Sequence, residues 1–325
     1  MKTILITGAS GFIGKALCRA LSMKYRIIGL DRTPCFDSQD SRIFVTADIE
    51  DEAAMKHVCN TYLPDVVIHC AGLAHQNFRT KQKADSYMRI NCLAAEKLAY
   101  YAASANPNLY FIFFSSVSVY GENHADPVVC ETDPCLPTSH YAKSKLNAEN
   151  RLVTLHDETI LKKLDILRLA SVYDNGWGFN LEKRVFAPKK IMYLRFGSGE
   201  QKLSALARQN LIDFIDFRLK QMINRPFCNI LNVCDTYPYS FNEIIDVFQK
   251  TRYQPQRMVV TIPLHAFDMP TRLMGWLLKN QSLWIRSFYH KLAKDLVFDN
   301  KKMMDTGFTP KWCLRSVFKN NGLQQ

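Results

Sequence analysis

Long apolar runs recur through the first third of the chain, and stretches with helical periodicity separate most of them. The runs are almost continuously apolar rather than alternating, which is typical of strands buried on both faces. They lie at 2–7, 26–31, 42–48, 65–71 and 109–116. Strands of this kind with helices between them indicate a parallel sheet that is covered on both sides. The pattern therefore predicts an α/β fold built on a doubly wound parallel sheet.

The segment between the first two strands shows the helical pattern most clearly. Its apolar positions recur at helical spacing, at Phe12, Ile13, Ala16, Leu17, Ala20 and Leu21. Such spacing gives a helix one apolar stripe that can pack on a sheet. The beginning of the chain therefore predicts a βαβ unit.

Beyond residue 170 the pattern changes, because the apolar runs become shorter and prolines more frequent. We expect a sheet domain over 1–170 and a smaller C-terminal α/β lobe over 171–325. Within the lobe, 211–223 has a helical pattern and 227–235 resembles a buried strand. The segment of about 205–235 is therefore expected to rejoin the first sheet.

Composition agrees with a folded globular protein of 325 residues, with 47% hydrophobic and 22% charged residues. The ten cysteines form no CxxC pair and lie largely inside apolar runs, which argues against disulfides and a metal site. The first residues lack the long apolar segment of a secretory signal, so we expect a cytoplasmic protein. The longest uncharged stretch, 98–121, is interrupted by Asn106-Pro107-Asn108 and does not predict a membrane span.

The formal charge of +12 favours a polyanionic partner without identifying it. Nucleic acid is disfavoured, because no recognition motif accompanies the charge and the aromatic residues lie inside strand runs. The stretch 263–292 combines basic residues with an apolar set made of Leu273, Met274, Trp276, Leu277, Leu278, Trp284, Ile285, Phe288 and Leu292. This stretch could contact an anionic bilayer or pack on the lobe's own core, and amphipathic helices more often do the latter.

Three glycines, Gly8, Gly11 and Gly14, lie where the first strand gives way to the first helix. The first allows a tight turn, the second allows the backbone to approach a pyrophosphate, and the third allows the helix to pack on the strand. Phe12 and Ile13 then open the helix, whose N-terminus favours negative charge. The motif predicts a dinucleotide site on a Rossmann-type sheet.

The residues after the second and third strands refine the choice of dinucleotide. Asp31 ends the second strand, 17 residues beyond Gly14, where a carboxylate accepts hydrogen bonds from a ribose diol and repels a 2′-phosphate. This favours NAD as the cofactor, whereas Arg32 leaves NADP open. Asp48, at the end of the third strand, is expected to contact the adenine amino group.

A catalytic set follows the fifth strand. Ser116 ends that strand, and 25 residues later Tyr141 and Lys145 lie four apart on one face of a predicted helix. A phenol titrates near ~10 in water, so Tyr141 needs a nearby cation to act as an acid or base at neutral pH. Lys145 and an oxidised nicotinamide would supply one, and Ser116 would hydrogen-bond the reacting oxygen.

Taken together, these motifs resemble those of the extended short-chain dehydrogenases/reductases of the sugar-nucleotide epimerase/dehydratase family. The resemblance covers most of the chain and rests on GASGFIG, Asp31, Ala47-Asp48, the HCAG at 69–72, Asn91, SSVSVYG, YAKSK and LRLASVY. It implies further cofactor contacts from Ile49, Cys70, Ala71, Gly72 and Asn91, besides Tyr141 and Lys145. It also implies a sugar-diphosphate substrate in the C-terminal lobe.

The substrate side departs from the family pattern. Dehydratases of the family resemble one another in carrying Asp-Glu directly after the catalytic hydroxyl residue, where this chain has Val117 and Ser118. A neutral pair cannot shuttle protons, so a dehydratase is disfavoured. Ser171 and Lys202 occupy the places of the family's asparagine and diphosphate-binding arginine. We expect Ser118, Ser171 and Lys202 to face the substrate.

The hypothesis that remains is hydride transfer at one carbon of the sugar. The chain most resembles a branch that makes bacterial surface polysaccharides and acts on sugar nucleotides or polyprenyl-diphosphate-linked N-acetylhexosamines. A C4 epimerase is the main hypothesis, with a 4-keto-6-deoxy sugar-nucleotide reductase as the alternative. A non-catalytic dinucleotide sensor is the third. The resemblance also implies a homodimer formed through helices at 91–103 and 141–155.

Overall fold

The computed structural model describes residues 1–34, 43–74, 85–121, 126–221, 225–251, 257–264 and 294–319. Among these residues the chain folds into two compact units. The first is built from Met1–Gly121, Cys135–Arg168 and Ile215–Leu231. The second is built from Glu122–Pro134, Leu169–Phe214 and Asn232–Gln325. Each unit therefore collects segments that are far apart in the sequence.

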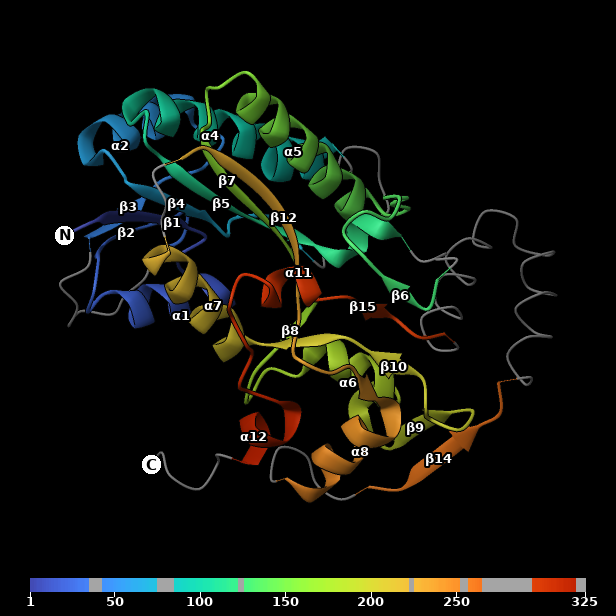
Figure 1. Cartoon of the computed structure of the whole chain (residues 1–325). Helices are drawn as coiled ribbons and strands as arrows, with labels where there is room; N and C mark the ends of the chain where they lie inside the picture. Colours follow the sequence, from blue (N-terminus) through green and yellow to red (C-terminus); the bar gives the residue numbers. More distant parts are fainter. Residues whose placement is uncertain are drawn as a thin grey trace. The chain divides into compact units, whose positions relative to one another are not determined.

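A seven-stranded sheet with the order β12-β7-β5-β4-β1-β2-β3 forms the centre of the first unit (Figure 1). Its strands are β1 (Thr3–Thr7), β2 (Arg26–Asp31), β3 (Ile43–Thr46), β4 (Val66–His69), β5 (Tyr110–Ser116), β7 (Lys163–Leu169) and β12 (Phe227–Val233). The pairs from β3 through β5 are all parallel. Ile4 lies opposite Ile27 on one side and Val66 on the other, so β1 is central.

Helices cover both faces of this sheet (Figure 1). On one face lie α2 (Glu52–Tyr62), α4 (Ala94–Ala105) and α5 (His140–Asp157), and on the other lie α1 (Phe12–Leu21) and α7 (Arg208–Lys220). Strands between two helical layers have no wet face, which explains why their sequences are almost continuously apolar. The predicted doubly wound, Rossmann-type parallel sheet is confirmed.

Local sequence explains where these helices begin and end. Asp51 caps α2 by accepting a hydrogen bond from the Ala54 amide at 3.0 Å, and Leu63 ends the helix in a left-handed conformation with φ of 43°. In α1 the predicted apolar stripe is buried at Leu17 and Leu21. A different helix type, the π-helix η1 (Met88–Leu93), precedes α4 directly. The sequence pattern did not predict it.

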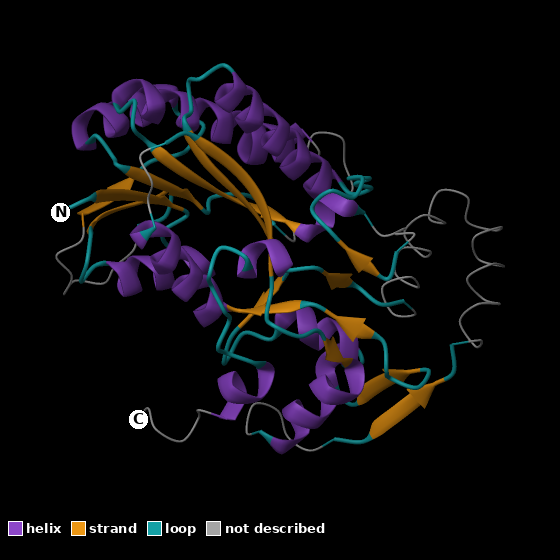
Figure 2. Ribbon diagram, viewed as in Figure 1, coloured by secondary structure: helices purple, strands orange, loops and turns teal. Residues whose placement is uncertain are grey.

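The second unit has its own elements (Figure 2). Its strands form two-stranded sheets, of which β8–β11, β9–β14 and β6–β15 are parallel and β10–β13 is antiparallel. The strands are β6 (Val128–Val129), β8 (Ser171–Tyr173), β9 (Tyr193–Phe196), β10 (Lys202–Leu203), β11 (Ala205–Ala207), β13 (Tyr239–Ser240), β14 (Val259–Ile262) and β15 (Val297–Phe298). Among its described residues, the helices that lie wholly in this unit are α6 (Phe179–Val185), η3 (Pro188–Lys190), α8 (Phe241–Lys250), α11 (Lys301–Met304) and α12 (Leu314–Lys319).

Asp235 joins several elements inside the second unit. Its carboxylate is buried and accepts hydrogen bonds from the hydroxyls of Tyr173 and Tyr239 at 2.7 and 2.8 Å. The Ala207 amide and the Asn210 side chain donate to its other oxygen at 2.8 and 2.7 Å. These four donors partly offset the burial of a charge and connect β8, α7, β11 and β13.

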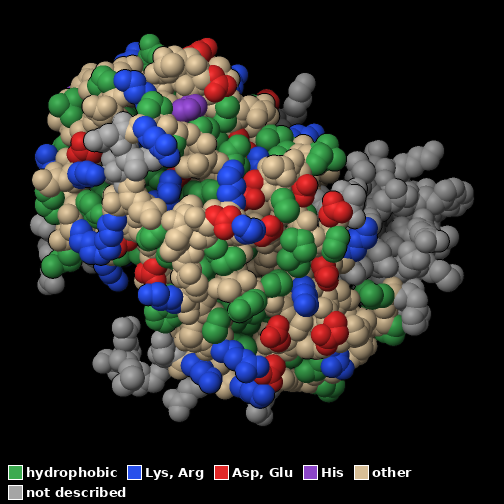
Figure 3. Space-filling view, viewed as in Figure 1, with side chains coloured by type: hydrophobic (Ala, Val, Ile, Leu, Met, Phe, Trp, Pro, Cys, Tyr) green, Lys and Arg blue, Asp and Glu red, His purple; other side chains and the backbone are tan. Residues whose placement is uncertain are grey.

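Two sequence predictions concern the tail and the charge. The stretch 265–293, whose apolar and basic residues could contact a bilayer or pack on the lobe's own core, lies outside the described residues. In the part of the chain that the structure describes, no helix has the length and apolarity needed to cross a membrane. On the face shown in Figure 3, Lys and Arg side chains lie among Asp and Glu side chains. The net charge by itself therefore identifies no partner.

Candidate active site

The glycine motif forms a close-packed turn between β1 and α1. Gly8 has a φ of +68°, and the Gly11 amide donates to its carbonyl oxygen at 3.0 Å. A Cβ added at Gly14 would lie 2.1 Å from that oxygen, and one added at Gly8 would lie 2.8 Å from the Ala71 nitrogen. The N-cap of α1, Gly11, offers no side-chain acceptor to the helix amides. The turn therefore presents backbone N–H groups to an anion without obstructing side chains, which fits a pyrophosphate.

Asp31 is the next predicted cofactor-binding residue along the chain. Its carboxylate accepts hydrogen bonds from the Ser10 amide at 3.0 Å and the Thr33 amide at 3.2 Å. These two bonds hold the carboxylate between the glycine turn and the end of β2, with acceptor capacity left for a ribose hydroxyl. Arg32 is exposed beside it.

The residues after β3 and β4 lie at the same carboxyl edge of the sheet. Asp48 is exposed and accepts a hydrogen bond from the Glu50 amide at 2.9 Å, with half-buried Ile49 between them. After β4, the Ala71 amide, which lies between Cys70 and Gly72, donates to the Thr7 hydroxyl at 3.2 Å. In open α/β sheets ligands bind at this edge. The predicted cofactor residues after these strands therefore share one edge with the glycine turn.

Asn91 connects this edge to the catalytic helix. Its fully buried amide accepts a hydrogen bond from the Leu73 amide at 2.7 Å and donates to the Leu73 carbonyl oxygen at 3.1 Å. It also donates to the Ser144 hydroxyl at 3.0 Å. Because a Cβ at Gly72 would come within 2.9 Å of the Asn91 side-chain oxygen, Gly72 is required for this approach. The π-helix η1 places Asn91 in this position, and Ser144 is a contact that the sequence did not indicate.

The predicted catalytic side chains converge where β5 ends and α5 begins. Ser116 is the last residue of β5, and its hydroxyl accepts hydrogen bonds from the amide and the hydroxyl of Ser118 at 3.2 and 3.0 Å. Tyr141, in the first turn of α5, lies near Ser116, whose hydroxyl lowers the pKa of the phenol. One turn later Lys145 is buried, donates to the Phe114 carbonyl oxygen at 2.8 Å and lies 4.7 Å from the centre of the Phe113 ring.

Burial sets the electrostatics of this site. It raises the pKa of the Tyr141 phenol above its usual value, while the hydrogen bond to Ser116 lowers it and the neighbouring Tyr87 raises it further. Burial also lowers the pKa of Lys145 to about 8. The Lys145 ammonium is therefore still the major form at pH 7, and Tyr141 is neutral until positive charge is placed beside it.

The predicted substrate residues fall into both units. Ser118 lies in the short helix η2 (Val117–Tyr120) of the first unit, where it contacts Ser116. In the second unit, half-buried Ser171 begins β8 opposite Ala205, and exposed Lys202 begins β10. No described contact joins Ser171 to Lys202. Their role toward a substrate stays a prediction.

Among the described residues, no group of three or more His, Cys, Asp or Glu side chains could hold a metal ion. Two charged residues near the catalytic set escaped the sequence prediction. They are Glu149, one helical turn after Lys145, and Arg168, which like Asp165 is a charged residue inside the buried strand β7. A charge inside an apolar strand is the signal that could have indicated this pair.

A Rossmann-type sheet with a glycine turn and a Ser-Tyr-Lys set at its carboxyl edge defines an NAD-binding enzyme class. The model of the NAD dependent epimerase/dehydratase family matches residues 4–218. The chain belongs to this family. Membership confirms the predicted family, the enzyme class and NAD as the cofactor.

Two curated relatives and one solved structure illustrate the similarity. The chain is 25% identical over 322 residues to the N-acetyl-alpha-D-glucosaminyl-diphospho-ditrans,octacis-undecaprenol 4-epimerase of Escherichia coli O157:H7, covering 96% of this chain and 91% of that protein. It is 30% identical over 222 residues to the UDP-glucose 4-epimerase of Vibrio cholerae, which is 66% of this chain and 65% of that protein. The fold matches the UDP-Glc/GlcNAc 4-epimerase of Campylobacter jejuni with a TM-score of 0.75 at 22% identity, covering 98% and 97% of the two chains.

Proposed function

We propose that this protein is an NAD-dependent C4 epimerase of a diphosphate-linked N-acetylhexosamine, carried by a nucleotide or a polyprenyl lipid. The placement of Ser116 at the end of β5, near Tyr141 and with buried Lys145 one turn further along α5, is the observation that carries the proposal. The chain is similar along nearly its whole length to a 4-epimerase of a lipid-linked sugar. This similarity supports a sugar that is linked through a diphosphate to its carrier as the substrate.

The chemistry follows from the positions of these side chains. Bound NAD would supply a hydride acceptor and a positive charge. That charge, together with the Lys145 ammonium, favours ionisation of Tyr141, which burial otherwise opposes. Tyr141 then takes the proton of the sugar 4-hydroxyl as hydride leaves C4, while Ser116 hydrogen-bonds the same oxygen. After the keto sugar has turned, Tyr141 would return the proton to the same oxygen while C4 regains a hydride on its opposite face, so that no NAD would be consumed.

The dehydratase alternative remains disfavoured, because Val117 and Ser118 supply no acid or base. The reductase alternative uses the same residues in one direction, with Tyr141 donating its proton to a ketone. The two reactions differ in whether reduced cofactor is consumed.

The proposal is tested by NMR of the purified protein with UDP-N-acetylglucosamine, and in parallel with its polyprenyl-diphosphate counterpart, each with a trace of NAD. We expect the C4 epimer to appear without net change in NAD. Tyr141→Phe should reduce the rate by at least about 10²-fold, the usual contribution of a positioned acid–base group. Tyr100→Phe makes the same change at an exposed position on α4 and should leave the rate intact.

Other outcomes would overturn the proposal. Stoichiometric consumption of NADH on a 4-keto-6-deoxy sugar nucleotide, without epimer, would establish the reductase. NAD binding with no turnover on any of these substrates would favour the sensor.

A further inference from the structure

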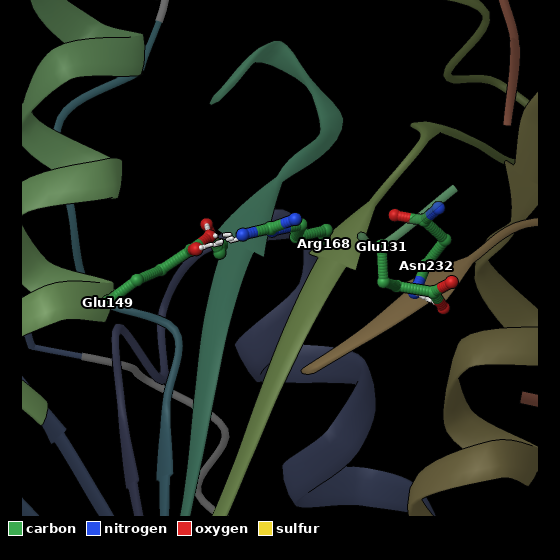
Figure 4. Close-up of polar contacts among 5 residues, drawn as sticks. Glu131, Glu149, Arg168 and Asn232 are labelled. Atoms are coloured by element: carbon green, nitrogen blue, oxygen red, sulfur yellow. Dashed lines mark hydrogen bonds and ion pairs between the residues drawn. The ribbon is translucent and has the colours of Figure 1, made fainter. Parts of the chain in front are cut away.

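A buried ion pair lies on the same elements as the catalytic residues and has no part in the proposed reaction. Glu149 is 1% and Arg168 is 4% exposed. The Arg168 Nη2 donates to the Glu149 Oε2 at 2.7 Å, and its Nε lies 3.2 Å from both carboxylate oxygens. Figure 4 shows Glu149 reaching from α5 toward Arg168 on β7. Burying such a pair gives little net stability, so stability alone does not account for its position.

Glu149 connects the catalytic helix to the strand that carries Ser116. It follows Tyr141 and Lys145 at intervals of one helical turn, so the three residues share one face of α5. The Ser115 hydroxyl donates a hydrogen bond to the Glu149 Oε1. Since Ser115 directly precedes Ser116, this bond fixes the end of β5 against the helix that carries Tyr141 and Lys145.

Arg168 acts on the segment that follows Ser116. Its guanidinium carbon lies 4.8 Å from the centre of the Tyr120 ring. Tyr120 is buried and is the last residue of η2, the short helix that begins directly after Ser116. The same guanidinium forms the forked contact with Glu149. Arg168 therefore touches both α5 and the turn through which Ser118 reaches Ser116.

The charge of Glu149 also acts on the pKa of Lys145. Burial lowers the pKa of Lys145, whereas Cys70 and then the Glu149 carboxylate raise it. His69 also faces the lysine, whose charge lowers the pKa of the histidine. The negative charge of Glu149 thus opposes the loss of the Lys145 proton.

We propose that Glu149 and Arg168 are positioning residues that hold Tyr141 and Lys145 of α5 in register with Ser116 at the end of β5. The inference rests on the proposed catalytic use of these three residues. It assigns the ion pair to the geometry of the reaction and not to the stability of the fold. A small displacement of reacting groups is enough to lower a rate by about 10²-fold.

The structure offers a matched control in the same strand. Asp165 of β7 is fully buried and forms its own ion pair with Arg218, whose Nε lies 2.8 Å from the carboxylate. Asn229 donates to it at 2.9 Å, and the Tyr110 hydroxyl donates to it as well. None of these partners belongs to the catalytic set. Asp165→Asn therefore perturbs a buried ion pair of the same unit without touching Ser116, Tyr141 or Lys145.

The test compares Glu149→Gln, Arg168→Lys and Asp165→Asn for kcat, KM, the pH profile and NAD affinity, with stability measured in parallel. We expect Glu149→Gln to lower kcat by about 10–10²-fold at little changed KM and NAD affinity, and to move the alkaline limb of the profile to lower pH. Arg168→Lys keeps the charge but loses the fork, so kcat should fall while the alkaline limb stays in place. Asp165→Asn should change stability alone.

A kcat and pH profile of Glu149→Gln that match those of Asp165→Asn at equal loss of stability would overturn the inference. A separate readout covers the case in which the wild type turns over no sugar, which would contradict the proposed function. NMR titration of ¹³C-labelled lysine should then show a lower pKa for Lys145 in Glu149→Gln and an unchanged one in Asp165→Asn. Equal titration in both variants would overturn the positioning role.

Discussion

Gly14 is a position of the cofactor turn at which a hydrogen atom fits and a side chain does not. The spacing of the three glycines was visible in the sequence, but the reason for a glycine at position 8 is tertiary. Gly14 faces the Gly8 carbonyl oxygen within its own motif, whereas Gly8 faces the backbone at Ala71, which follows β4. A local pattern can suggest the first contact. It carries no information on the second, because 63 residues separate the partners.

Gly14→Ala is therefore expected to weaken both the fold and NAD binding. Its Cβ would lie 2.1 Å from a backbone oxygen, so α1 must move away from the turn. Overpacking of this kind costs about 2 kcal/mol of unfolding free energy. Chemical unfolding and calorimetric titration with NAD measure the two effects.

Gly176→Ala is the control, because a Cβ there meets nothing within 4 Å and only the positive φ of +79° opposes it. This variant should bind NAD normally. A Gly14→Ala protein with wild-type affinity for NAD would show that the close approach is not needed.

At the scale of elements, β4 is the clearest case of a strand whose chemistry depends on its neighbours. Its apolar run predicted a buried strand, and the structure places it between β1 and β5. The strand ends in His69, which is fully buried and pairs its Nδ1 with the Thr7 hydroxyl at 2.8 Å. Among the described residues its Nε2 has no hydrogen-bond partner. Burial and the charge of Lys145 lower the pKa of His69 to about 3.

This shift predicts that acid destabilises the fold. Between pH 6.5 and about 3 the unfolded chain binds a proton at His69 that the folded chain does not, so stability falls as the pH falls. At pH 5 the loss amounts to about 2 kcal/mol. Urea unfolding at pH 7 and pH 5 measures it, and His69→Phe should remove most of this difference.

His57→Gln changes an exposed histidine of α2 and should keep the wild-type dependence on pH. If His69→Phe also keeps it, other groups cause the loss in acid. The π-helix η1 illustrates the same limit for helices, since the family resemblance implied a helix at 91–103 but not the wider turn at Met88–Leu93 that directs the Asn91 side chain. The predicted use of two helices in a homodimer stays a prediction.

At the scale of the whole molecule, the two units have separate cores and separate polar centres. The predicted cofactor and catalytic residues all belong to the first unit. The second unit is organised around Asp235, and near it the amide of Asn232 donates to the Glu131 carboxylate at 2.7 Å (Figure 4). Since burial raises the pKa of Asp235 to about 6, its four donors only partly compensate for the buried charge.

Asp235→Ala should therefore destabilise the second unit by about 3 kcal/mol, because it leaves buried donors without an acceptor. Asp235→Asn should cost less, since its amide can still donate to the two tyrosine hydroxyls. We expect both variants to bind NAD with wild-type affinity in calorimetric titration. Loss of NAD affinity in parallel with stability would show that the second unit supports the cofactor site.

The sequence by itself determined the parallel sheet, the glycine turn and the order of the Ser116, Tyr141 and Lys145 positions. These features follow from apolar periodicity and short spacings, which are properties of neighbouring residues. Only the tertiary structure decided that Asn91 meets Leu73, that His69 is buried beside Lys145, and that Glu149 pairs with Arg168. Each of these contacts joins residues from different elements, and its free energy depends on burial and on partners that chain folding brings together. No local pattern encodes such a partner, which is why these contacts were found only in the folded protein.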